Sequence, residues 1–387
     1  MTETQLAPAG IIGAFEHPER RIPDGTISDV VADVSVGAMV DAGVGPEDID
    51  GFFFAGVHQG ISLVAMADHL GLDRLTHVDS TDIGGASTMS QIGHAAEAIA
   101  AGKCSIGLIA MGGRPLSTRA RPTGLEAGAR FHSEVDLSQI AAYSLVAQRH
   151  MYEFGTTREQ LAEVKVAAST HAQHNPNARL QQPVSVGEVL ESPMISDPLR
   201  RMDCCVTTDG GGAVIVASRE VIEESGASAA WIRGWAETLR TTAGGRIDLM
   251  QGGADRTSRA AFEQAGVTTT DIDYASIYDS FTITVILALE NLGFCERGEG
   301  GRFVADGGLV APFGRLPINT DGGGLSNNHP DRRGGMPRTI EAVRQVRGQA
   351  HPELQVRDVE HVLVHGIGHS LGTNASAATL VLGREAQ

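Results

Sequence analysis

The chain has 387 residues, of which 42% are hydrophobic and 4% aromatic, and its formal net charge is −17. This length allows two or three domains with a sizeable core, and the 48 glycines suit closely packed layers of helices and sheets. The acidic balance disfavours nucleic acid or an anionic membrane as the main partner.

The four cysteines form no CxxC pair, so neither a disulfide framework nor a common zinc site is expected. The chain starts without a basic segment and long apolar run, and it contains no stretch of about 18 apolar residues. We therefore expect a cytoplasmic protein that has no membrane span and binds no metal.

An internal repeat organises the chain. Residues 42–50 read AGVGPEDID and residues 265–273 read AGVTTTDID, so six of nine positions match at a separation of 223 residues. Each copy follows a predicted helix and precedes a predicted apolar strand. These helices and strands are Val31–Asp41 with 51–56, and Ser258–Gln264 with 274–278.

The later parts of the two copies also correspond. Residues 92–101 and 338–347 are predicted helices, and strands are predicted over 106–111 and 359–365. Alternating helices and short apolar strands are typical of a mostly parallel sheet covered by helices. We therefore predict an α/β fold with duplicated α/β/α/β/α layers and an inserted loop domain.

The domain boundaries follow from a break in this alternation. Between 115 and 200 six prolines punctuate two predicted helices, 136–154 and 157–173, and a strand over 212–217 then resumes the pattern. The predicted domains are 1–114 with 201–240 as the N-terminal half, 115–200 as the inserted loop domain, and 241–387 as the C-terminal half. Residues 297–321, rich in glycine and proline, are predicted to form a loop at the mouth of a site.

The turn over 82–89 is rich in glycine and serine and leads into a predicted helix. Backbone N–H groups at a helix N-terminus carry partial positive charge and can stabilise a thioester oxyanion or a thiolate. A simple connection between strand and helix explains the same composition, so both interpretations stay open.

The stretch YDSFT at 278–282 ends a predicted strand and enters a predicted helix over 283–292. Asp279 or Ser280 suits the cap of that helix. Tyr278 then lies at the carboxyl end of the strand, where open α/β sheets bind their ligands.

The stretch NTDGGGLSNNHP at 319–330 contains three consecutive glycines, which let the backbone approach a ligand closely. His329 precedes a proline and is therefore expected to be extended. A histidine in this place suits an acid, a base or an oxyanion donor. The pairs Arg200–Arg201 and Arg332–Arg333 are candidates for a phosphate-binding patch, although solvated surface arginines explain them equally.

Several common motifs are missing. His365 and His369 have a spacing that pairs histidines on a helix, but the two intervening glycines disfavour a helix and no HExxH glutamate is present. No GxSxG, GxGxxG or GxxxxGK[ST] occurs between a predicted strand and helix, which disfavours the usual hydrolase, dinucleotide and P-loop interpretations.

Taken in order, these segments resemble the thiolase superfamily, and most of all its sterol-carrier-protein or lipid-transfer branch. The likeness runs from about Gly10 to Gly383, and its most specific parts are SPMISDPLRRMDCC at 192–205 and the region 278–304. The resemblance implies a thiolase-like duplicated layered fold, a homodimer and acyl-CoA substrates. Coenzyme A would enter as part of the substrate, and the chain would bind no cofactor of its own.

The resemblance also assigns positions. The nucleophilic cysteine of thiolases falls at Gly85, their second cysteine at His365, and their Asn or His before Asp/Glu-x-Phe at Tyr278. The histidine of their Gly-His-Pro motif is kept as His329, with Asn328 in place of glycine. Because glycine forms no acyl-enzyme, the ping-pong thiolase route is closed, and a backbone amide with empty space is expected there.

This pattern is similar to the thiolase-fold aldolases that lack the cysteine and shorten steroid side chains. Those enzymes work with a small partner, built of an OB fold and a zinc ribbon, that helps to bind the acyl-CoA. The leading interpretation is therefore retro-aldol cleavage of a β-hydroxyacyl-CoA by a carbon–carbon lyase. The predicted catalytic residues are Tyr278, His329 and His365, and the predicted oxyanion- and thioester-binding residues are Gly85, Ala86, Asn319 and Gly366.

Two other interpretations remain open. One is a Claisen-type acyltransferase, similar to acetyl-CoA acetyltransferases, that receives its acyl group from a partner's thiol. The other is a non-catalytic lipid or acyl-CoA binder. Turnover of acyl-CoA and labelling of a partner cysteine distinguish the three.

Overall fold

The computed structural model describes residues 8–56, 60–118, 138–241, 246, 248–369, 371 and 374–386. Within them, one mixed sheet has the strand order β3-β2-β4-β7-β1-β8-β11-β10-β9, and β5 and β6 form a separate ribbon. The strands are β1 (Ala9–Glu16), β2 (Gly51–Phe54), β3 (His77–Asp79), β4 (Ile106–Gly113), β5 (Met194–Ser196), β6 (Leu199–Arg200), β7 (Gly210–Ser218), β8 (Ala230–Arg240), β9 (Tyr274–Ile277), β10 (His361–His369) and β11 (Ala375–Gly383). The α-helices are α1 (Ile27–Ala42), α2 (Leu63–Leu70), α3 (Ser87–Ala100), α4 (Pro115–Thr118), α5 (Gln139–Phe154), α6 (Arg158–Ala172), α7 (Val186–Glu191), α8 (Arg219–Ser225), α9 (Ala254–Ala265), α10 (Thr282–Leu292), α11 (Gly300–Val304) and α12 (Gly335–Arg347).

The sequence repeat is a repeat of local structure. Helices α1 and α9 both end at a glycine in the left-handed region, Gly43 at φ 71° and Gly266 at φ 66°, a conformation that costs other residues more. A 3₁₀ turn follows each cap, Pro46–Asp48 in one copy and Thr269–Asp271 in the other. The matched residues therefore encode the same connection from helix to buried strand.

The last residue of each repeat fastens the strand that follows to a neighbouring strand. The carboxylate of Asp50 accepts the N–H of Ile106 at 2.7 Å. The carboxylate of Asp273 accepts the N–H of His361 at 3.0 Å. Both contacts join the start of a parallel strand to the start of its neighbour, which explains why an aspartate closes each copy.

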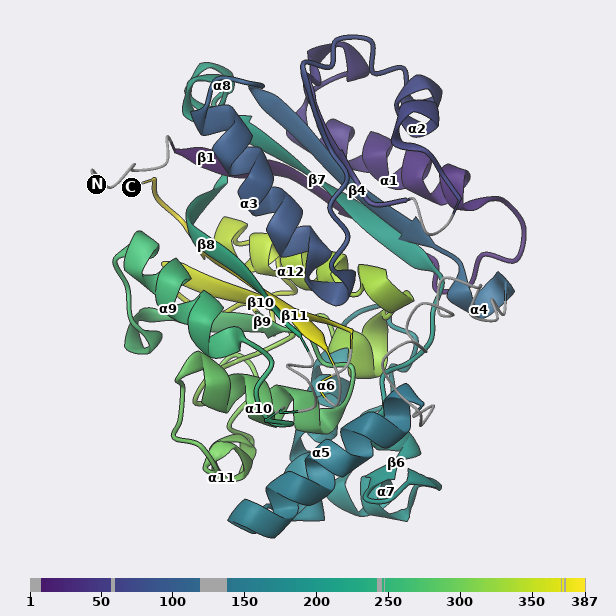
Figure 1. The fold of residues 1–387 in the computed structure, drawn as a ribbon, viewed down its shortest axis with the longest axis vertical. Helices are drawn as coiled ribbons and strands as arrows, with labels where there is room; N and C mark the ends of the chain where they lie inside the picture. The colour runs from purple at the N-terminus through teal and green to yellow at the C-terminus, as the bar shows by residue number, and fades with distance from the viewer. Residues whose placement is uncertain are drawn as a thin grey trace.

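The two halves share one strand order and enclose two buried helices. Strands β2, β4, β7 and β1 are adjacent in the first half, and β9, β10, β11 and β8 repeat that order in the second. Figure 1 shows α3 and α12 between the two parts of the sheet, with α1 and α2 on one outer side and α9 and α10 on the other. Three separate apolar clusters fill these contacts. The predicted thiolase-like α/β/α/β/α layering is confirmed.

Close packing in the central layer depends on small residues. A Cβ at Gly93 in α3 would lie 2.0 Å from the ring of Trp235 in β8. Met89, Ile92 and Ile340, from α3 and α12, are fully buried in the same cluster. Each aliphatic side chain buried in this way contributes about 1.5–3 kcal/mol, so the central pair of helices is held mainly by apolar contact.

Two boundaries differ from those predicted. Strand β8 was placed in the first half, but it pairs with β11 from Trp231 to Arg240 and with β1 only near Ala230. In the sheet, β8 therefore pairs mainly with a strand of the second half. The predicted loop over 297–321 contains the short helix α11. Of the predicted insertion, residues 119–137 lie outside the described residues.

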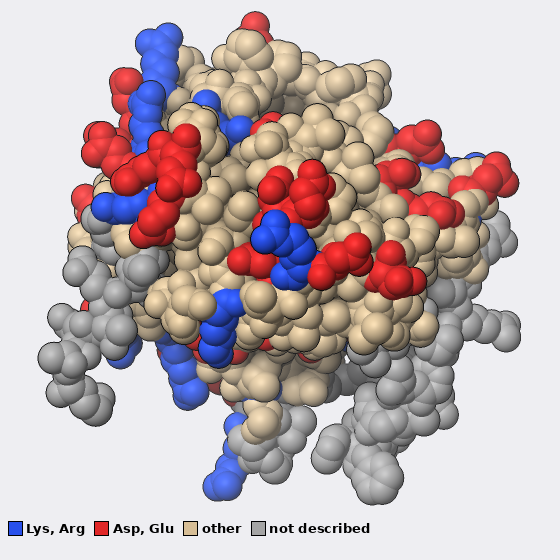
Figure 2. Space-filling model, turned by 90° about the horizontal axis from the view of Figure 1, so that it is seen from above, with Lys and Arg blue, Asp and Glu red and all other residues tan. Residues whose placement is uncertain are grey.

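The surface agrees with the composition. Figure 2 shows several groups of acidic side chains, with basic ones among them, on the face at the top of Figure 1. Across the described ranges, no helix combines the length and the apolar character needed to cross a membrane.

Candidate functional site

The side chain of Tyr278 lies where the N-terminal ends of α3 and α12 meet. A Cβ at Gly85, just before α3, would lie 2.6 Å from the Tyr278 ring, and a Cβ at Gly334, just before α12, would lie 2.9 Å from it. The ring therefore fills the volume that a side chain at position 85 would need. The expectation of empty space beside Gly85 is wrong, because a phenol occupies it.

Tyr278 is the first residue after β9. Its N–H donates to the carbonyl of His365 at 2.9 Å, and its hydroxyl donates to the carbonyl of Asp331 at 3.1 Å. Burial raises the pKa of Tyr278 well above its ordinary value, and the neighbouring Cys205 and Asp331 add to this effect. The phenol is therefore protonated at neutral pH and can serve as a donor.

The imidazole of His329 lies against the same phenol. The two ring centroids are 5.3 Å apart, with the rings 69° from parallel. Burial lowers the pKa of His329 to about 4, although Asp331 opposes the change. Its Nε2 is buried and has no hydrogen-bond partner among the described residues. A neutral histidine, which can accept a proton, thus lies against a protonated tyrosine, which can donate one.

A buried ionic cluster holds the loop that carries His329. Arg338 of α12 pairs with Asp321 and lies 3.6 Å from Asp279. The carboxylate of Asp279 accepts the N–H groups of Gly324 and Leu325 at 2.7 and 3.1 Å. The predicted capping of α10 is wrong, since that helix has no side-chain cap and Asp279 instead fixes the glycine turn.

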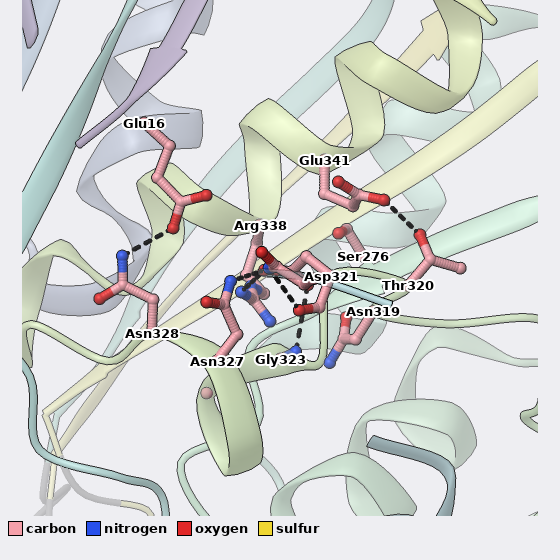
Figure 3. Close-up of polar contacts among 12 residues, drawn as sticks. Glu16, Ser276, Asn319, Thr320, Asp321, Gly323, Asn327, Asn328, Arg338 and Glu341 are labelled. Atoms are coloured by element: carbon pink, nitrogen blue, oxygen red, sulfur yellow. Dashed lines mark hydrogen bonds and ion pairs between the residues drawn. The ribbon is translucent and has the colours of Figure 1, made fainter. Parts of the chain in front are cut away.

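Further polar contacts extend this cluster to both halves of the chain, as Figure 3 shows. Asn327 donates to Asp321 at 2.7 Å, and Asn328 donates to Glu16 of β1 at 2.7 Å. On the other side, Thr320 donates to Glu341 of α12 at 2.6 Å. The turn Gly323–Asn327 is therefore held from several sides before the chain reaches His329.

The side chain of Asn319, which was predicted to bind an oxyanion, hydrogen-bonds to the backbone of β9. Its side-chain oxygen accepts the N–H of Ile277, and its side-chain nitrogen donates to the carbonyl of Ile277, both at 2.8 Å. Since β9 is the last strand of the sheet, this amide takes the place of a neighbouring strand. Both polar atoms of the Asn319 side chain are engaged by the backbone of Ile277, so the structure does not place that side chain where it could serve as the predicted oxyanion donor.

The strand β10 turns His365 and Gly366 to opposite faces. A Cβ at Gly366 would lie 2.9 Å from both the Gly85 oxygen and the Ala86 Cα, so these three predicted residues are brought together. The ring of His365 instead reaches the Thr379 hydroxyl, with Nδ1 at 3.0 Å. The structure does not bring His365 to the Tyr278 side, because neighbouring residues of a strand alternate in direction. On β10 the residue that faces Gly85 is Gly366.

His365 lines a small cavity of its own. The cavity is bounded by the first residues of α9 and by one side of α10, with Asn291, Ile367 and Leu371 in its wall. Burial lowers the pKa of His365 to about 4, so the ring is neutral. It is a buried polar group in a mainly apolar wall, separate from the pair Tyr278–His329.

A second pocket opens at the N-terminus of α3. It is lined by Asp82 and Ser87 of that turn, by Arg332 and Arg333, and by the ends of β2 and β4. Arg332 lies 3.9 Å from Asp82, and Arg333 lies 3.5 Å from Asp331. One of the two predicted arginine pairs thus borders the site, although each arginine already has an acidic neighbour.

The four cysteines do not supply an obvious nucleophile. Burial raises the pKa of Cys104 to about 11 and that of Cys204 and Cys295 to about 12, and it also raises that of Cys205. Cys205 interacts electrostatically with Tyr278, but a protonated thiol is a weak nucleophile.

Among the described residues no group of three or more His, Cys, Asp or Glu side chains suits a metal ion. His365 and His369 lie on a strand, the first buried and the second exposed.

Sequence reasoning missed the residues that hold the loop. Arg338, Asp321 and Glu16 are each less than one-tenth exposed, as is Thr208. Charged residues are almost never buried so fully unless they are paired. The run of neighbouring polar residues at 319–321 and 326–329 was the available signal, but their partners come from remote parts of the chain.

Comparisons with known proteins give consistent results. Residues 237–384 match the family described as Thiolase C-terminal domain-like. An acetyl-CoA acetyltransferase of Methanothermobacter thermautotrophicus is 33% identical over 98% of this chain and 100% of its own length. A 17-hydroxy-3-oxo-4-pregnene-20-carboxyl-CoA lyase of Mycobacterium tuberculosis is 31% identical over 92% of this chain and 93% of its own.

Solved structures agree on the fold. The Ltp2-ChsH2(DUF35) aldolase superposes with a TM-score of 0.86 at 29% identity, covering 98% of each chain. A monomeric SCP2-thiolase like protein type 1 from Mycobacterium smegmatis has a TM-score of 0.74 at 18% identity, covering 100% of this chain and 78% of its own, and supports the fold alone.

Proposed function

The chain belongs to the thiolase superfamily, and from this premise we propose that it is a carbon–carbon lyase that splits a β-hydroxyacyl-CoA by a retro-aldol reaction. The observation that carries the proposal is the Tyr278 ring, which fills the space beside Gly85 and lies against the neutral imidazole of His329. The relatives named as a lyase and as a steroid side-chain-cleaving aldolase, each 31% identical, support it. Coenzyme A would enter only as part of the substrate.

The reaction needs one base and one acid. In the proposed step, His329 Nε2 takes the proton of the β-hydroxyl, the Cα–Cβ bond breaks, and the hydroxyl carbon leaves as a ketone or aldehyde. The electron pair of the broken bond becomes the enolate of the shortened thioester. Tyr278 then gives its proton to Cα, and the proton on His329 returns to the phenolate. No covalent enzyme intermediate is required, in keeping with a glycine at position 85.

The enolate oxygen needs positive potential, and the convergence of α3 and α12 supplies it. Both helices start beside the Tyr278 ring, next to Gly85 and Gly334 respectively. Backbone N–H groups and the dipoles of two buried helices stabilise an anion placed there. Gly85, Ala86 and Gly366 are proposed to border the thioester oxygen, since their lack of bulk leaves the backbone close to it.

The test is an assay of β-hydroxyacyl-CoA for a released ketone or aldehyde together with a shorter acyl-CoA. Tyr278→Phe and His329→Gln are each expected to lower kcat by about 10²–10⁴-fold, the usual contribution of acid–base groups. Tyr152→Phe and His351→Gln, which change exposed side chains, should leave kcat unchanged. Wild-type turnover that survives the combined Tyr278 and His329 changes would reject these roles.

An acyltransferase is the second candidate, because the acetyl-CoA acetyltransferase relative matches nearly the whole chain. It requires a thiol that accepts the acyl group, and Cys205, which interacts electrostatically with Tyr278, is one candidate in this chain. Incubation with acyl-CoA followed by mass spectrometry distinguishes the two. An acyl adduct on Cys205 that is lost in Cys205→Ser would favour transfer, and an unmodified chain with ketone release would favour the lyase.

We also propose that the chain works as a homodimer with a small acyl-CoA-binding partner of the OB-fold and zinc-ribbon type. The superposing aldolase structure is named as an assembly with ChsH2(DUF35), which supports such a partner. Co-purification from the native host, followed by mass measurement of the intact assembly, tests both statements. An assay that gains activity when the co-purified subunit is added would place that subunit in the reaction.

A further inference from the structure

Thr208 holds the backbone of His329 on both sides. The N–H of His329 donates to the Thr208 hydroxyl oxygen at 2.9 Å, and the N–H of Thr208 donates to the His329 carbonyl at 3.4 Å. Thr208 is fully buried, so these contacts are shielded from water. The position of His329 is therefore set by the position of Thr208.

Asn328 decides where the Thr208 hydroxyl points. Its side-chain oxygen accepts that hydroxyl at 2.6 Å, and its side-chain nitrogen donates to Glu16 at 2.7 Å. Asn328 is fully buried and uses both ends of its amide. Because the Thr208 hydroxyl donates its hydrogen to Asn328, a lone pair on the Thr208 oxygen is free to accept the His329 N–H.

Glu16 in turn is fixed by a cation. Its Oε1 also accepts from Arg20 at 2.8 Å, and Arg344 lies 3.7 Å from its Oε2. Burial raises its pKa, but Arg20 and Arg344 more than offset this, so the pKa of Glu16 is lowered. The ionised carboxylate is thus a fixed acceptor in the first half of the chain for an amide in the second half (Figure 3).

We propose that Asn328 is a positioning residue for His329, and that Glu16 of the first half orients Asn328 for this task. The inference rests on the proposed function, in which the imidazole acts as the base. Proton transfer requires the base within hydrogen-bond distance of the substrate hydroxyl, and a displacement of about 1 Å can cost about 10²-fold in rate. The contacts of Asn328 set the backbone from which that ring projects.

Asn328→Asp tests the proposal with almost no change in volume. It places a second carboxylate against Glu16 and removes the amide donor, which should displace Thr208 and His329. The expected result is a fall in kcat of about 10²-fold, with KM unchanged. Asn177→Asp, which adds the same charge in an exposed turn, should leave kcat unchanged.

A double variant distinguishes a loss of His329 positioning from a general loss of stability. In Glu16→Gln combined with Asn328→Asp, the glutamine nitrogen donates to the new carboxylate, which still accepts the Thr208 hydroxyl, and the hydrogen bond from Arg20 to this position is lost. The double variant carries the same net charge as the wild type and restores the hydrogen bond between positions 16 and 328, so part of the lost kcat should return. A double variant as slow as Asn328→Asp, at an equal unfolding midpoint, would overturn the proposal.

A measurement without substrate keeps the inference apart from the lyase assignment. The ring resonances of His329, followed by NMR against pH, should titrate near pH 4 in the wild type, shift in Asn328→Asp, and return in the double variant. Identical titrations in all three proteins would overturn the positioning role. If this pattern holds while no β-hydroxyacyl-CoA is cleaved, the reaction is rejected and the positioning role stands.

Discussion

Tyr278 and Gly85 form a coupled pair at the scale of single residues. The phenol ring lies 2.6 Å from the place where a Cβ on Gly85 would be. Cores tolerate little extra volume, so the absence of a side chain at 85 is a condition for the ring being there. The placement of the Tyr278 phenol and the absence of a side chain at position 85 are thus one structural feature.

Gly85→Ala tests this coupling. The added methyl is expected to lower the free energy of unfolding by about 1–3 kcal/mol, as overpacking does, and combining it with Tyr278→Ala should relieve part of that loss. Gly187→Ala is the matched control, since a Cβ there meets only a hydroxyl at 3.9 Å. Urea titration measures all four proteins. Equal midpoints for Gly85→Ala and the wild type would contradict the close contact.

A pH dependence is expected from His365. Burial lowers its folded-state pKa to about 4 from 6.5, so between those pH values the unfolded chain binds a proton that the folded chain does not. Stability should therefore fall as pH drops from 6.5 to 4, by about 1.4 kcal/mol per unit of pKa difference. His365→Leu should remove this part of the pH dependence. The check is the difference in unfolding free energy between pH 7 and 5 for both proteins, and equal differences would contradict it.

Some site residues were predictable at this scale, and others were not. Tyr278 and His329 stand next to recognisable strand ends and glycine turns, so their neighbourhood followed from the chain. The roles of Asn319 and His365 did not, because they depend on which way a side chain points from an edge or a strand. His365 and Gly366 differ by one position, and only the register of β10 with β9 decides which faces Gly85.

Strand β9 illustrates the scale of elements. It is an edge strand of four residues, and edge strands leave backbone groups unpaired. The Asn319 amide satisfies both groups of Ile277, while a nearby bridge joins Ala275 to Ile318. The segment that leads to the glycine turn is thereby laid along the sheet.

Asn319→Leu should therefore act on stability. Each backbone group left buried without a partner costs about 1–3 kcal/mol, and the folded fraction should keep its kcat. Asn177→Leu, at an exposed position, should change neither quantity. Chemical denaturation and steady-state kinetics on the same samples decide the matter, since lost kcat at unchanged stability would restore the oxyanion role.

The repeated elements were predictable because their signals are local. Helix caps, 3₁₀ turns and closing aspartates recur in both copies, so α1, α9, β2 and β9 follow from the pattern. Strand β8 did not follow, since its sequence AWIRGWAETLR mixes charged and aromatic residues. Its place between β1 and β11 is fixed by pairing with distant strands.

At the scale of the whole molecule, the halves meet at β1 and β8 and at α3 and α12, and polar contacts also join them. His94 of α3 lies 3.0 Å from Asp79 in the first half and 3.4 Å from Glu237 in the second. Hydrogen bonds to these two carboxylates raise the pKa of His94 to about 10 against the effect of burial. A charged imidazole therefore bridges the halves at neutral pH.

This bridge predicts that the folded protein becomes less stable at alkaline pH. The raised folded-state pKa means that the stabilisation is complete below pH 6.5 and is lost as pH rises through about 10. His94→Gln should lower the thermal midpoint at pH 6 and make it less sensitive to pH between 6 and 10. Scanning calorimetry of both proteins across that range is the measurement, and parallel pH profiles would contradict the bridge.

The layered plan was predictable at this scale, because two copies of one motif require two similar halves. The boundary between them was not, since the sheet continues from β1 into β8 without a linker. Contacts that cross between the halves, such as Glu16 with Asn328, depend on how the two copies pack together. The sequence of one copy alone does not reveal them.

The Tyr278 ring beside Gly85 also limits which substitutions at these two positions can follow one another in evolution. A change of Gly85 to cysteine would place the new side chain against the phenol, and a change that removed the phenol first would remove the proposed proton donor before a nucleophile was present. Under the proposed function, neither order of these two substitutions passes through an active enzyme. A stepwise change from the lyase reaction to thiolase chemistry is therefore expected to be disfavoured.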